Sequence, residues 1–339
     1  MSRILLISPS FFGYRQRVSE ELIRQGHAVE CMDDRPREDV TFKSLAKISY
    51  KLVEGSIDRY ATSLARYVAD KRFDQVIYMG GMSFCWTRSQ FERIRHASDA
   101  TFTAYLWDSI ANCQRFKDSM DLFDRVLSFE PEDCEQYGME LRPLFYSDAY
   151  RGLPLTPDDG FQWDACFIGS VHQPSKFHTV LEIARALERH GLRVFTWFYM
   201  PSRSVEKLRK LTDATYRGVE FKFEGLPADK VAGVYAHSRC IIDSPQQGQL
   251  GLTMRTLETV GARRKLITAN HDVAHYDFHA NGDVLVWDGT QSVDDEFFAR
   301  PFHPLPDDVY RSYSIAEFAR TLLDDGHTYH GYDRKEHQK

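Results

Sequence analysis

The sequence predicts two α/β domains in tandem, each built on a parallel β-sheet flanked by helices. Three observations support this fold class. Apolar, strand-like runs alternate with helical patterns along both halves of the chain, and strands separated by helices favour parallel sheets with right-handed crossovers. The 339 residues are more than a single core usually supports. A non-periodic stretch near Tyr150 interrupts the alternation, which then starts again.

The N-terminal half, residues 1–150, begins with a strand-like run at 3–8. A helical pattern follows at 15–27, and we expect Gly26 to end it because glycine adopts the left-handed conformation of a helix C-terminus without strain. Further strand-like runs occur at 28–34, 73–81, 100–109 and 123–130. Each is followed by polar or helix-compatible residues, so this half predicts one α/β domain.

The connection between the halves is predicted at 150–162, which contains two prolines, two glycines and two aspartates. The C-terminal half, residues 151–325, restarts with a strand-like run at 163–171 and a helical pattern at 177–191 that Gly191 would end. Its other predicted strands are 192–200, 219–225, 239–245, 265–270 and 283–289. Residues 326–339 are predicted to be a tail.

Composition restricts the partners and the compartment. The formal net charge of -6, from 43 basic and 49 acidic residues, argues against nucleic acid or an anionic membrane as the main partner. The six cysteines form no C-x-x-C pair, so they are interpreted as reduced cytosolic thiols. No run approaches the roughly 18 apolar residues of a membrane span. We therefore expect a cytoplasmic protein, which would contact the inner membrane face peripherally if its substrate is lipid-linked.

Cofactor signals are weak. The loop after the first strand has one glycine instead of G-x-G-x-x-G, and no Walker motif occurs, which disfavours an NAD-dependent oxidoreductase or a P-loop enzyme. No His/Asp/Glu cluster has metal-ligand spacing, and no convincing D-x-D motif ends a strand. We therefore expect neither a metal nor another cofactor.

The carboxyl ends of parallel strands are where ligands bind in open α/β sheets. In the N-terminal half this places Gly13, Tyr14 and Arg15 after the first strand, where the loop either lets a substrate approach backbone N–H groups or merely turns the chain. Asp108 ends the strand in "YLWDS". It would be a general base on an acceptor hydroxyl in an inverting transfer; otherwise it positions the acceptor, or caps the next helix with Ser109.

A pair of opposite charges marks the C-terminal half. Arg255 and Glu258 stand three apart in the first turns of a helix predicted to begin around Thr253. One interpretation is an ion pair on a solvated face, which contributes about 0.2–0.5 kcal/mol. The other is a ligand site, because arginine binds phosphate bidentately and a carboxylate accepts both hydroxyls of a ribose. Arginine ahead of glutamate is the weaker order on a helix, so the ion pair alone explains the pattern poorly.

The stretch "GLTMRTLETVGARRKLITAN", residues 251–270, resembles the nucleotide-sugar-binding segment of group 1 glycosyltransferases. The resemblance is to the branch similar to spore-maturation CgeB and to bacterial lipopolysaccharide and capsule enzymes. "YLWDS" and "FDRVLSFEPEDCEQYG" are similar to the N-terminal half of that branch, and the resemblance extends over about residues 3–325. It implies the GT-B architecture, with two Rossmann-like domains facing a central cleft and the donor bound mainly to the second.

The resemblance also implies an activity. Such a protein would transfer a sugar from a nucleotide-sugar donor to a cell-surface glycan or its lipid-linked precursor, without a metal and more often with retention at the anomeric carbon. Arg255 and helix N-termini would then stabilise the leaving nucleoside diphosphate. An inverting transferase with Asp108 as base, and a sugar or nucleotide-binding protein without catalysis, are the alternatives.

Individual donor contacts are carried over by position. Glu258 matches the glutamate that holds the donor ribose, Arg255 stands at a phosphate contact, and Thr253 and Thr256 lie beside them. In the first strand-to-helix loop of the second domain, Gly169 and Ser170 would approach the diphosphate. His172 and Lys176 would add charge or hydrogen bonds there, or His172 is structural or simply exposed. The family has another glutamate where this chain has Leu250 next to Gln249, so the identity of the sugar stays open.

Overall fold

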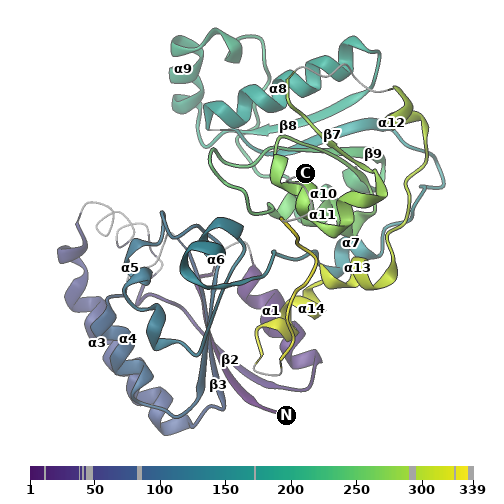
Figure 1. The fold of residues 1–339 in the computed structure, drawn as a ribbon. Coiled ribbons are helices and arrows are strands. Elements are labelled where there is room, and N and C mark those ends of the chain that lie inside the picture. Colours follow the sequence, from purple (N-terminus) through teal and green to yellow (C-terminus); the bar gives the residue numbers. More distant parts are fainter. Residues whose placement is uncertain are drawn as a thin grey trace. The chain divides into compact units, whose positions relative to one another are not determined.

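The computed structural model describes residues 1–10, 13–37, 39, 42, 49–81, 86–171, 173–289, 295–323 and 326–334. Contacts divide the chain into two compact units. Unit 1 comprises Met1–Pro143 and Ile315–Tyr329, and unit 2 comprises Leu144–Ser314 and His330–Lys339. Each unit holds one parallel sheet with helices on its faces (Figure 1). The predicted fold class, two α/β units with parallel sheets, is confirmed.

Unit 1 is built on a six-stranded sheet of order β2-β1-β3-β4-β5-β6. Its strands are β1 (Arg3–Ile7), β2 (Ala28–Met32), β3 (Gln75–Gly80), β4 (Thr101–Leu106), β5 (Arg125–Ser128) and β6 (Glu140–Leu141). All neighbouring strands pair in parallel. All six residues of β3 are buried, as expected for the middle of a sheet that helices cover on both faces.

Helices cover both faces of this sheet (Figure 1). Those within residues 1–143 are α1 (Tyr14–Arg24), η1 (Tyr50–Leu52), α3 (Glu54–Lys71), α4 (Arg88–Arg95), α5 (Gln114–Lys117), η2 (Met120–Leu122) and α6 (Pro131–Tyr137). The apolar face of α3, including Ile57, Leu64 and Val68, packs into one core cluster with β3 and β4. On the other face α1 packs against α14 (Ile315–Thr321).

The helix α14 comes from the end of the chain but belongs to unit 1. Phe318 lies edge-on to Tyr105 of β4 with ring centroids 4.9 Å apart. Gln75 of β3 donates from Nε2 to the carbonyl of Leu322 at 3.1 Å. After α14 the chain returns to unit 2, where the Tyr332 ring packs against Tyr276 at 4.8 Å.

Unit 2 is built on a five-stranded sheet of order β11-β10-β9-β7-β8. Its strands are β7 (Trp163–Ser170), β8 (Val194–Tyr199), β9 (Ser238–Asp243), β10 (Lys265–Thr268) and β11 (Val284–Val286). The strand predicted at 219–225 is wrong: this segment contributes a single bridge between Lys222 and Tyr199. In the sequence Val219, Phe221 and Phe223 alternate with charged residues, which is the pattern of a strand, although only the bridge forms.

The helices of unit 2 pack on both faces of its sheet. They are α7 (Asp148–Arg151), α8 (Pro174–Arg189), α9 (Arg203–Thr212), η3 (Ala214–Tyr216), α10 (Ala228–Ala236), α11 (Met254–Ala262), η4 (His271–His275), η5 (Asp277–Asn281), α12 (Asp295–Ala299) and α13 (Asp307–Ser312). Gly261 lets α11 approach closely, because a Cβ there would lie 2.5 Å from Cβ and Cγ of Tyr146.

Both sheets have a switch point, where consecutive connections run to opposite sides. In unit 1 it lies between β1 and β3, and in unit 2 between β7 and β9. The crevice beyond the carboxyl ends at a switch point is the usual ligand position in such sheets. The residues after these four strands are therefore the first place to look for a site.

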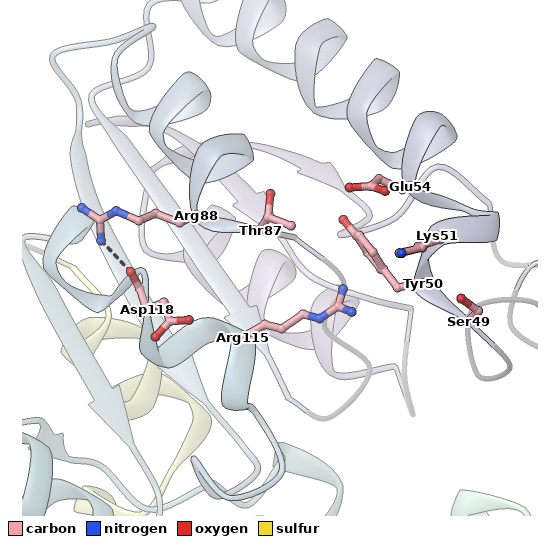
Figure 2. A pocket seen from close by; sticks show the side chains of 8 residues that line it. All are labelled: Ser49, Tyr50, Lys51, Glu54, Thr87, Arg88, Arg115 and Asp118. Atoms are coloured by element: carbon pink, nitrogen blue, oxygen red, sulfur yellow. Dashed lines mark hydrogen bonds between the residues drawn. The ribbon is translucent and has the colours of Figure 1, made fainter.

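Unit 1 also has a cavity of about 500 Å³ beside the first turns of α3 and α4 and the short helix α5 (Figure 2). The cavity is lined by polar and charged side chains together with Tyr50. None of the residues that the sequence predicted as sites is among those that line it.

Candidate functional site

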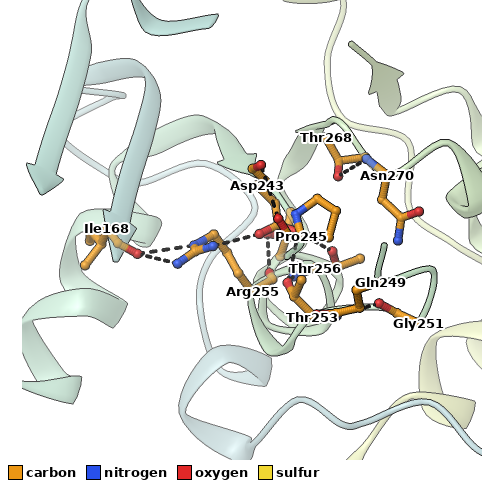
Figure 3. A network of polar contacts seen from close by, with 12 residues as sticks. Ile168, Asp243, Pro245, Gln249, Gly251, Thr253, Arg255, Thr256, Thr268 and Asn270 are labelled. Carbon is orange, nitrogen blue, oxygen red and sulfur yellow. Dashed lines mark hydrogen bonds and ion pairs between the residues drawn. The ribbon is translucent and has the colours of Figure 1, made fainter. Parts of the chain in front are cut away.

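Arg255 bridges the two strand ends at the switch point of unit 2 (Figure 3). Its Nη1 donates to Oδ1 of Asp243, the last residue of β9, at 2.7 Å. Its Nε and Nη2 donate to the carbonyl of Ile168 in β7 at 3.2 and 2.8 Å. The guanidinium also lies 4.6 Å from the centroid of the Phe167 ring. Arg255 is thus held in one position by contacts within the unit.

Two threonine hydroxyls also donate hydrogen bonds to the Asp243 carboxylate. The hydroxyls of Thr253 and Thr256 both donate to Oδ2, each at 2.9 Å. Thr253 is also the N-cap of α11, because its hydroxyl accepts from the backbone N–H of Thr256 at 3.2 Å. The same short segment therefore begins the helix and fixes it to the end of β9.

The electrostatics favour the ionised pair. Burial by itself would raise the pKa of Asp243, but the charges of Arg255 and Lys176 outweigh it and hold that pKa below its ordinary value. Burial likewise opposes the charge on Arg255, yet the Asp243 carboxylate raises the pKa of this arginine overall. The side chain of Asp243 is 0% exposed and that of Arg255 12%. A buried, hydrogen-bonded ion pair therefore occupies the switch point.

Lys176 adds a second positive charge beside Asp243. It stands in the first turn of α8, and its ammonium makes no hydrogen bond or ion pair with any residue that the structure describes. Burial and, to a smaller extent, the nearby charge of Arg255 lower the pKa of Lys176, and Asp243 partly opposes them, so that the pKa is about 8. An amine with no partner next to a second cation is poised to accept an anionic ligand.

The carboxyl end of β7 lies against the same arginine. Gly169 is required there, because a Cβ at this position would collide with the Arg255 guanidinium. Ser170 is the last residue of β7 and is partly buried. The predicted contact His172 falls outside the described residues. Gly169 thus lies against the Arg255 guanidinium, and Ser170 ends the same strand.

The remaining donor candidates are less tightly gathered. Glu258 lies one turn along α11 and is partly buried. Its charge acts on Arg255 and on the buried Tyr235. The pKa of Tyr235 is raised mainly by burial and, to a smaller extent, by the Glu258 carboxylate. Gln249 donates from Nε2 to the carbonyl of Gly251 at 2.8 Å, within its own loop. Asn270, after β10, donates to the carbonyl of Leu250 at 2.7 Å and closes the loop from the other side.

The predicted acceptor residues of unit 1 lie at its own switch point, after β1. Gly13 is the N-cap of α1 with φ of 71°, a left-handed conformation that favours glycine. Arg15 donates from Nη1 to the carbonyl of Ser8 at 2.9 Å and to Oδ2 of Asp33 at 3.2 Å. Tyr14 lies edge-on to Trp107 at the end of β4, with ring centroids 6.2 Å apart. Arg15 therefore anchors the loop to the ends of β1 and β2.

Asp108 follows β4 and lies beside Gly81, which follows β3. A Cβ on Gly81 would collide with the Asp108 carboxylate, so the two strand ends approach closely there. Neither Asp108 nor Ser109 caps the next helix, because α5 begins only at Gln114 with Cys113 before it. The capping interpretation of Asp108 is wrong, and its roles as base or positioning residue stay predictions.

The described part of the chain shows no group of three or more His, Cys, Asp or Glu side chains that could hold a metal ion. In the same residues no helix is long and apolar enough to cross a membrane.

Sequence reasoning missed Asp243, the centre of the polar network. A signal was present: "RCIIDSP" places an acid directly after three apolar residues at a predicted strand end. A carboxylate there is costly to bury unless a cation and several hydrogen-bond donors contact it, so the pattern implies a cationic partner nearby. Lys176, in contrast, was identified, but that it has no partner among the described residues depends on tertiary packing.

The fold matches solved structures of nucleotide-sugar enzymes at low sequence identity. The lipopolysaccharide outer core galactosyltransferase WaaB superposes with a TM-score of 0.50, at 13% identity over 78% of this chain and 80% of that chain. The UDP-GlcNAc 2-epimerase of Methanocaldococcus jannaschii gives 0.52, at 8% identity over 94% and 98% of the two chains. That of Neisseria meningitidis gives 0.53, at 9% identity over the same shares, 94% and 98%.

These similarities define the class of fold: the chain has two Rossmann-like units of the GT-B type, as the sequence predicted. No family model and no curated protein sequence matches the chain. The CgeB-like branch is therefore not confirmed. At such low identities the structural similarity shows a shared fold and does not by itself show a shared function.

Proposed function

We propose that this protein is a glycosyltransferase that moves a sugar from a nucleotide-sugar donor to a cell-surface glycan or its lipid-linked precursor. One observation carries the proposal: at the switch point of unit 2, a lysine that has no hydrogen-bond or ion-pair partner among the described residues stands beside a buried Asp243–Arg255 pair. The first turns of α8 and α11 begin at the same edge. Free N–H groups and helix dipoles at such positions favour an anion.

The roles of the donor residues follow from their contacts. Lys176 and the N–H groups at the beginning of α8 bind the diphosphate, and Gly169 keeps the loop close to it. Arg255 is already bound on three sides, so it contributes positive potential and holds β7 to β9 instead of gripping phosphate with both nitrogens. Glu258 accepts the ribose hydroxyls. The negative charge that develops on the leaving diphosphate is then stabilised by Lys176, by Arg255 and by the helix N-termini.

The acceptor binds to unit 1 in this proposal. Gly13, Tyr14 and Arg15 shape the loop after β1, and Asp108 positions the acceptor hydroxyl in a retaining transfer. If the transfer inverts the anomeric carbon, Asp108 is instead the general base that takes the hydroxyl proton. The lipopolysaccharide and capsule assignments come from the resemblance of residues 251–270 and from the name of WaaB.

A second candidate is a sugar-nucleotide epimerase. It is favoured by the similarity to two UDP-GlcNAc 2-epimerases over 94% of this chain, with TM-scores of 0.52 and 0.53. The same diphosphate and ribose contacts would serve that reaction, because both begin by binding a sugar nucleotide. The two activities differ in the fate of the sugar: a transferase delivers it to an acceptor, and an epimerase returns it altered at one carbon.

The test begins with thermal shift of the full chain against UDP, GDP, CMP, dTDP and NAD. We expect a nucleoside diphosphate to raise the melting temperature, and stabilisation by NAD alone would contradict the proposal. Sugar nucleotides with the preferred base are then incubated with cell-envelope glycan acceptors. Nucleoside diphosphate released only with acceptor supports a transferase, an epimerised sugar nucleotide supports the second candidate, and binding without turnover indicates a non-catalytic protein.

Glu258→Gln is expected to weaken nucleoside diphosphate binding about tenfold while leaving the melting temperature near that of wild type. The reason is that hydrogen bonds to a charged acceptor contribute about 1.5–3 kcal/mol, whereas Glu258 is only partly buried. Isothermal titration calorimetry measures the change. Glu220→Gln, at a side chain 81% exposed in the same unit, is the control. Equal affinities of the two variants would remove Glu258 from the site.

A peripheral membrane contact is the remaining part of the proposal, and α9 is the surface that fits it. No residue of α9 is buried, and Leu208 and Leu211 are 59% and 79% exposed. Arg203 and Lys207 are exposed on the same helix. A short helix with leucines and basic residues facing outward binds an anionic lipid surface by apolar burial and charge together.

The double variant Leu208→Ser, Leu211→Ser is expected to lose about tenfold or more in binding to phosphatidylglycerol vesicles, because each leucine would bury apolar area worth roughly 1.5–3 kcal/mol. Vesicle co-sedimentation measures it. Ile23→Ser with Leu52→Ser, at side chains 53% and 59% exposed in unit 1, is the matched control. Equal losses in both double variants would exclude α9 as a specific contact.

A further inference from the structure

We propose that the cavity of unit 1 binds a sugar residue that carries an acidic group, so that the acceptor is an acidic glycan. This inference rests on the proposed transferase function. The cavity, about 500 Å³, is large enough for a monosaccharide with part of its neighbour. Its walls come from the first turns of α3 and α4 and from α5, so three strand-to-helix connections meet there (Figure 2).

Two cations of the cavity, Arg115 and Lys51, have no ionic partner within the part of the chain that the structure describes. Arg115 and Lys51 make neither an ion pair nor a hydrogen bond with any residue that the structure describes. Arg88, in the same wall, contrasts with them: it is bound by both oxygens of Asp121, at 2.5 and 2.8 Å, and by Glu92 at 2.8 Å. The positive charge available to a ligand therefore belongs to Arg115 and Lys51.

Arg115 is held in position without losing its donors. Its guanidinium carbon lies 3.7 Å from the centroid of the Tyr50 ring. The N–H groups of a guanidinium lie in its own plane. When the flat face of the guanidinium packs on an aromatic ring, these groups can still donate to a planar acid. Because the side chain is already ordered, less conformational entropy is lost on binding a carboxylate or phosphate. Figure 2 shows Arg115 directed toward Tyr50 and Lys51.

The other wall residues suit sugar hydroxyls. The carboxylates of Glu54 and Asp118 have no ion-pair partner among the described residues, whereas the Thr87 hydroxyl already caps α4 and contacts Ser89. Carboxylates accept hydrogen bonds from hydroxyl groups, whereas a second acid on the ligand would be repelled by them. Two cations near two acids thus match a ring with several hydroxyls and one acidic group better than a polyanion.

The test uses nuclear magnetic resonance titration of the full chain with glucuronic acid, glucose 6-phosphate and glucose. We expect both acidic sugars to bind at least tenfold more tightly than glucose, and Arg115→Gln to lose about tenfold of that affinity. The two acidic probes distinguish a carboxylate from a phosphate as the preferred group. Equal binding of glucose and the acidic sugars would overturn the proposal.

Lys117→Gln is the matched control. Lys117 lies two residues further along α5, and its ammonium lies over a tyrosine ring, 4.9 Å from the centroid of Tyr137. It does not line the cavity. It is expected to retain wild-type affinity for acidic sugars, and equal losses in Arg115→Gln and Lys117→Gln would mean nonspecific attraction. Nucleoside diphosphate binding is measured in parallel. If acidic sugars bind and no nucleotide does, the cavity stands and the transferase function fails.

Discussion

Asp243→Asn is expected to lower the free energy of unfolding of unit 2 by about 3–5 kcal/mol, the usual cost of removing one partner from a buried ion pair. The substitution keeps the shape of the side chain but leaves the Arg255 charge buried without a counterion. It also weakens the acceptor of the Thr253 and Thr256 hydroxyls. Because Arg255 joins the ends of β7 and β9, the loss spreads to both strands. Thermal unfolding and hydrogen exchange in the peptides of β7, β9 and α11 measure it.

Asp164→Asn is the control for this experiment. Asp164 lies in β7 of the same sheet and pairs with Arg193 at 3.3 Å, but the arginine side chain is 55% exposed. Surface ion pairs contribute about 0–1 kcal/mol, so this variant should unfold close to wild type. A loss of stability in Asp243→Asn no larger than in Asp164→Asn would show that the buried pair does not hold the strand ends together.

The Asp243–Arg255 pair also limits what a substitution of Arg255 can show about donor binding. From the sequence, Arg255 is a phosphate ligand whose loss would weaken donor binding and leave the fold intact. In the structure it is bonded to Asp243 and to the Ile168 carbonyl, so Arg255→Ala would leave a buried carboxylate uncompensated. Loss of donor binding in that variant would not distinguish a missing contact from a disordered site. Glu258 and Lys176 are the better test positions.

The sequence predicted the strands well because most are buried runs between helices. Apolar runs such as those of β1, β3 and β9 are long enough to be recognised without tertiary information. The segment around Lys222 shows the limit of this reasoning: alternation indicates a possible strand, but pairing requires a neighbour along its whole length, and only a bridge to Tyr199 forms.

The sequence placed Arg255 near the start of a helix that follows a strand end, but it did not reveal the partners of Arg255. Helical spacing relates Arg255 to Glu258, because residues three apart share a face. The actual partner of Arg255 is Asp243, on a different element that the loop after β9 brings back to the helix. The cavity of unit 1 likewise could not be predicted from the sequence, because Tyr50, Thr87 and Arg115 come from three separate strand-to-helix connections. Such groupings depend on how the helices pack on the sheet.

Lys176→Gln is expected to weaken nucleoside diphosphate binding by roughly ten- to a hundredfold, because a charged hydrogen bond to phosphate contributes about 1.5–3 kcal/mol. Unlike Arg255, Lys176 holds no other described residue in place, so the fold should be kept. Isothermal titration calorimetry measures the affinity. Lys230→Gln, at an exposed lysine of α10, is the control for the loss of one charge. Wild-type affinity in Lys176→Gln would exclude this lysine from the diphosphate site.

The pH dependence of binding gives the sharper form of this prediction. Burial lowers the pKa of Lys176 to about 8 in the free protein, so the ammonium is charged below pH 8 and increasingly neutral above it. A bound diphosphate favours the charged amine, and binding above pH 8 therefore requires the uptake of a proton. Affinity should fall about tenfold between pH 7 and pH 9 in wild type. Lys176→Gln should bind weakly at both pH values with little change, since its side chain cannot titrate. A pH-independent affinity in wild type together with a large loss in Lys176→Gln would place the lysine at the ligand but contradict its lowered pKa.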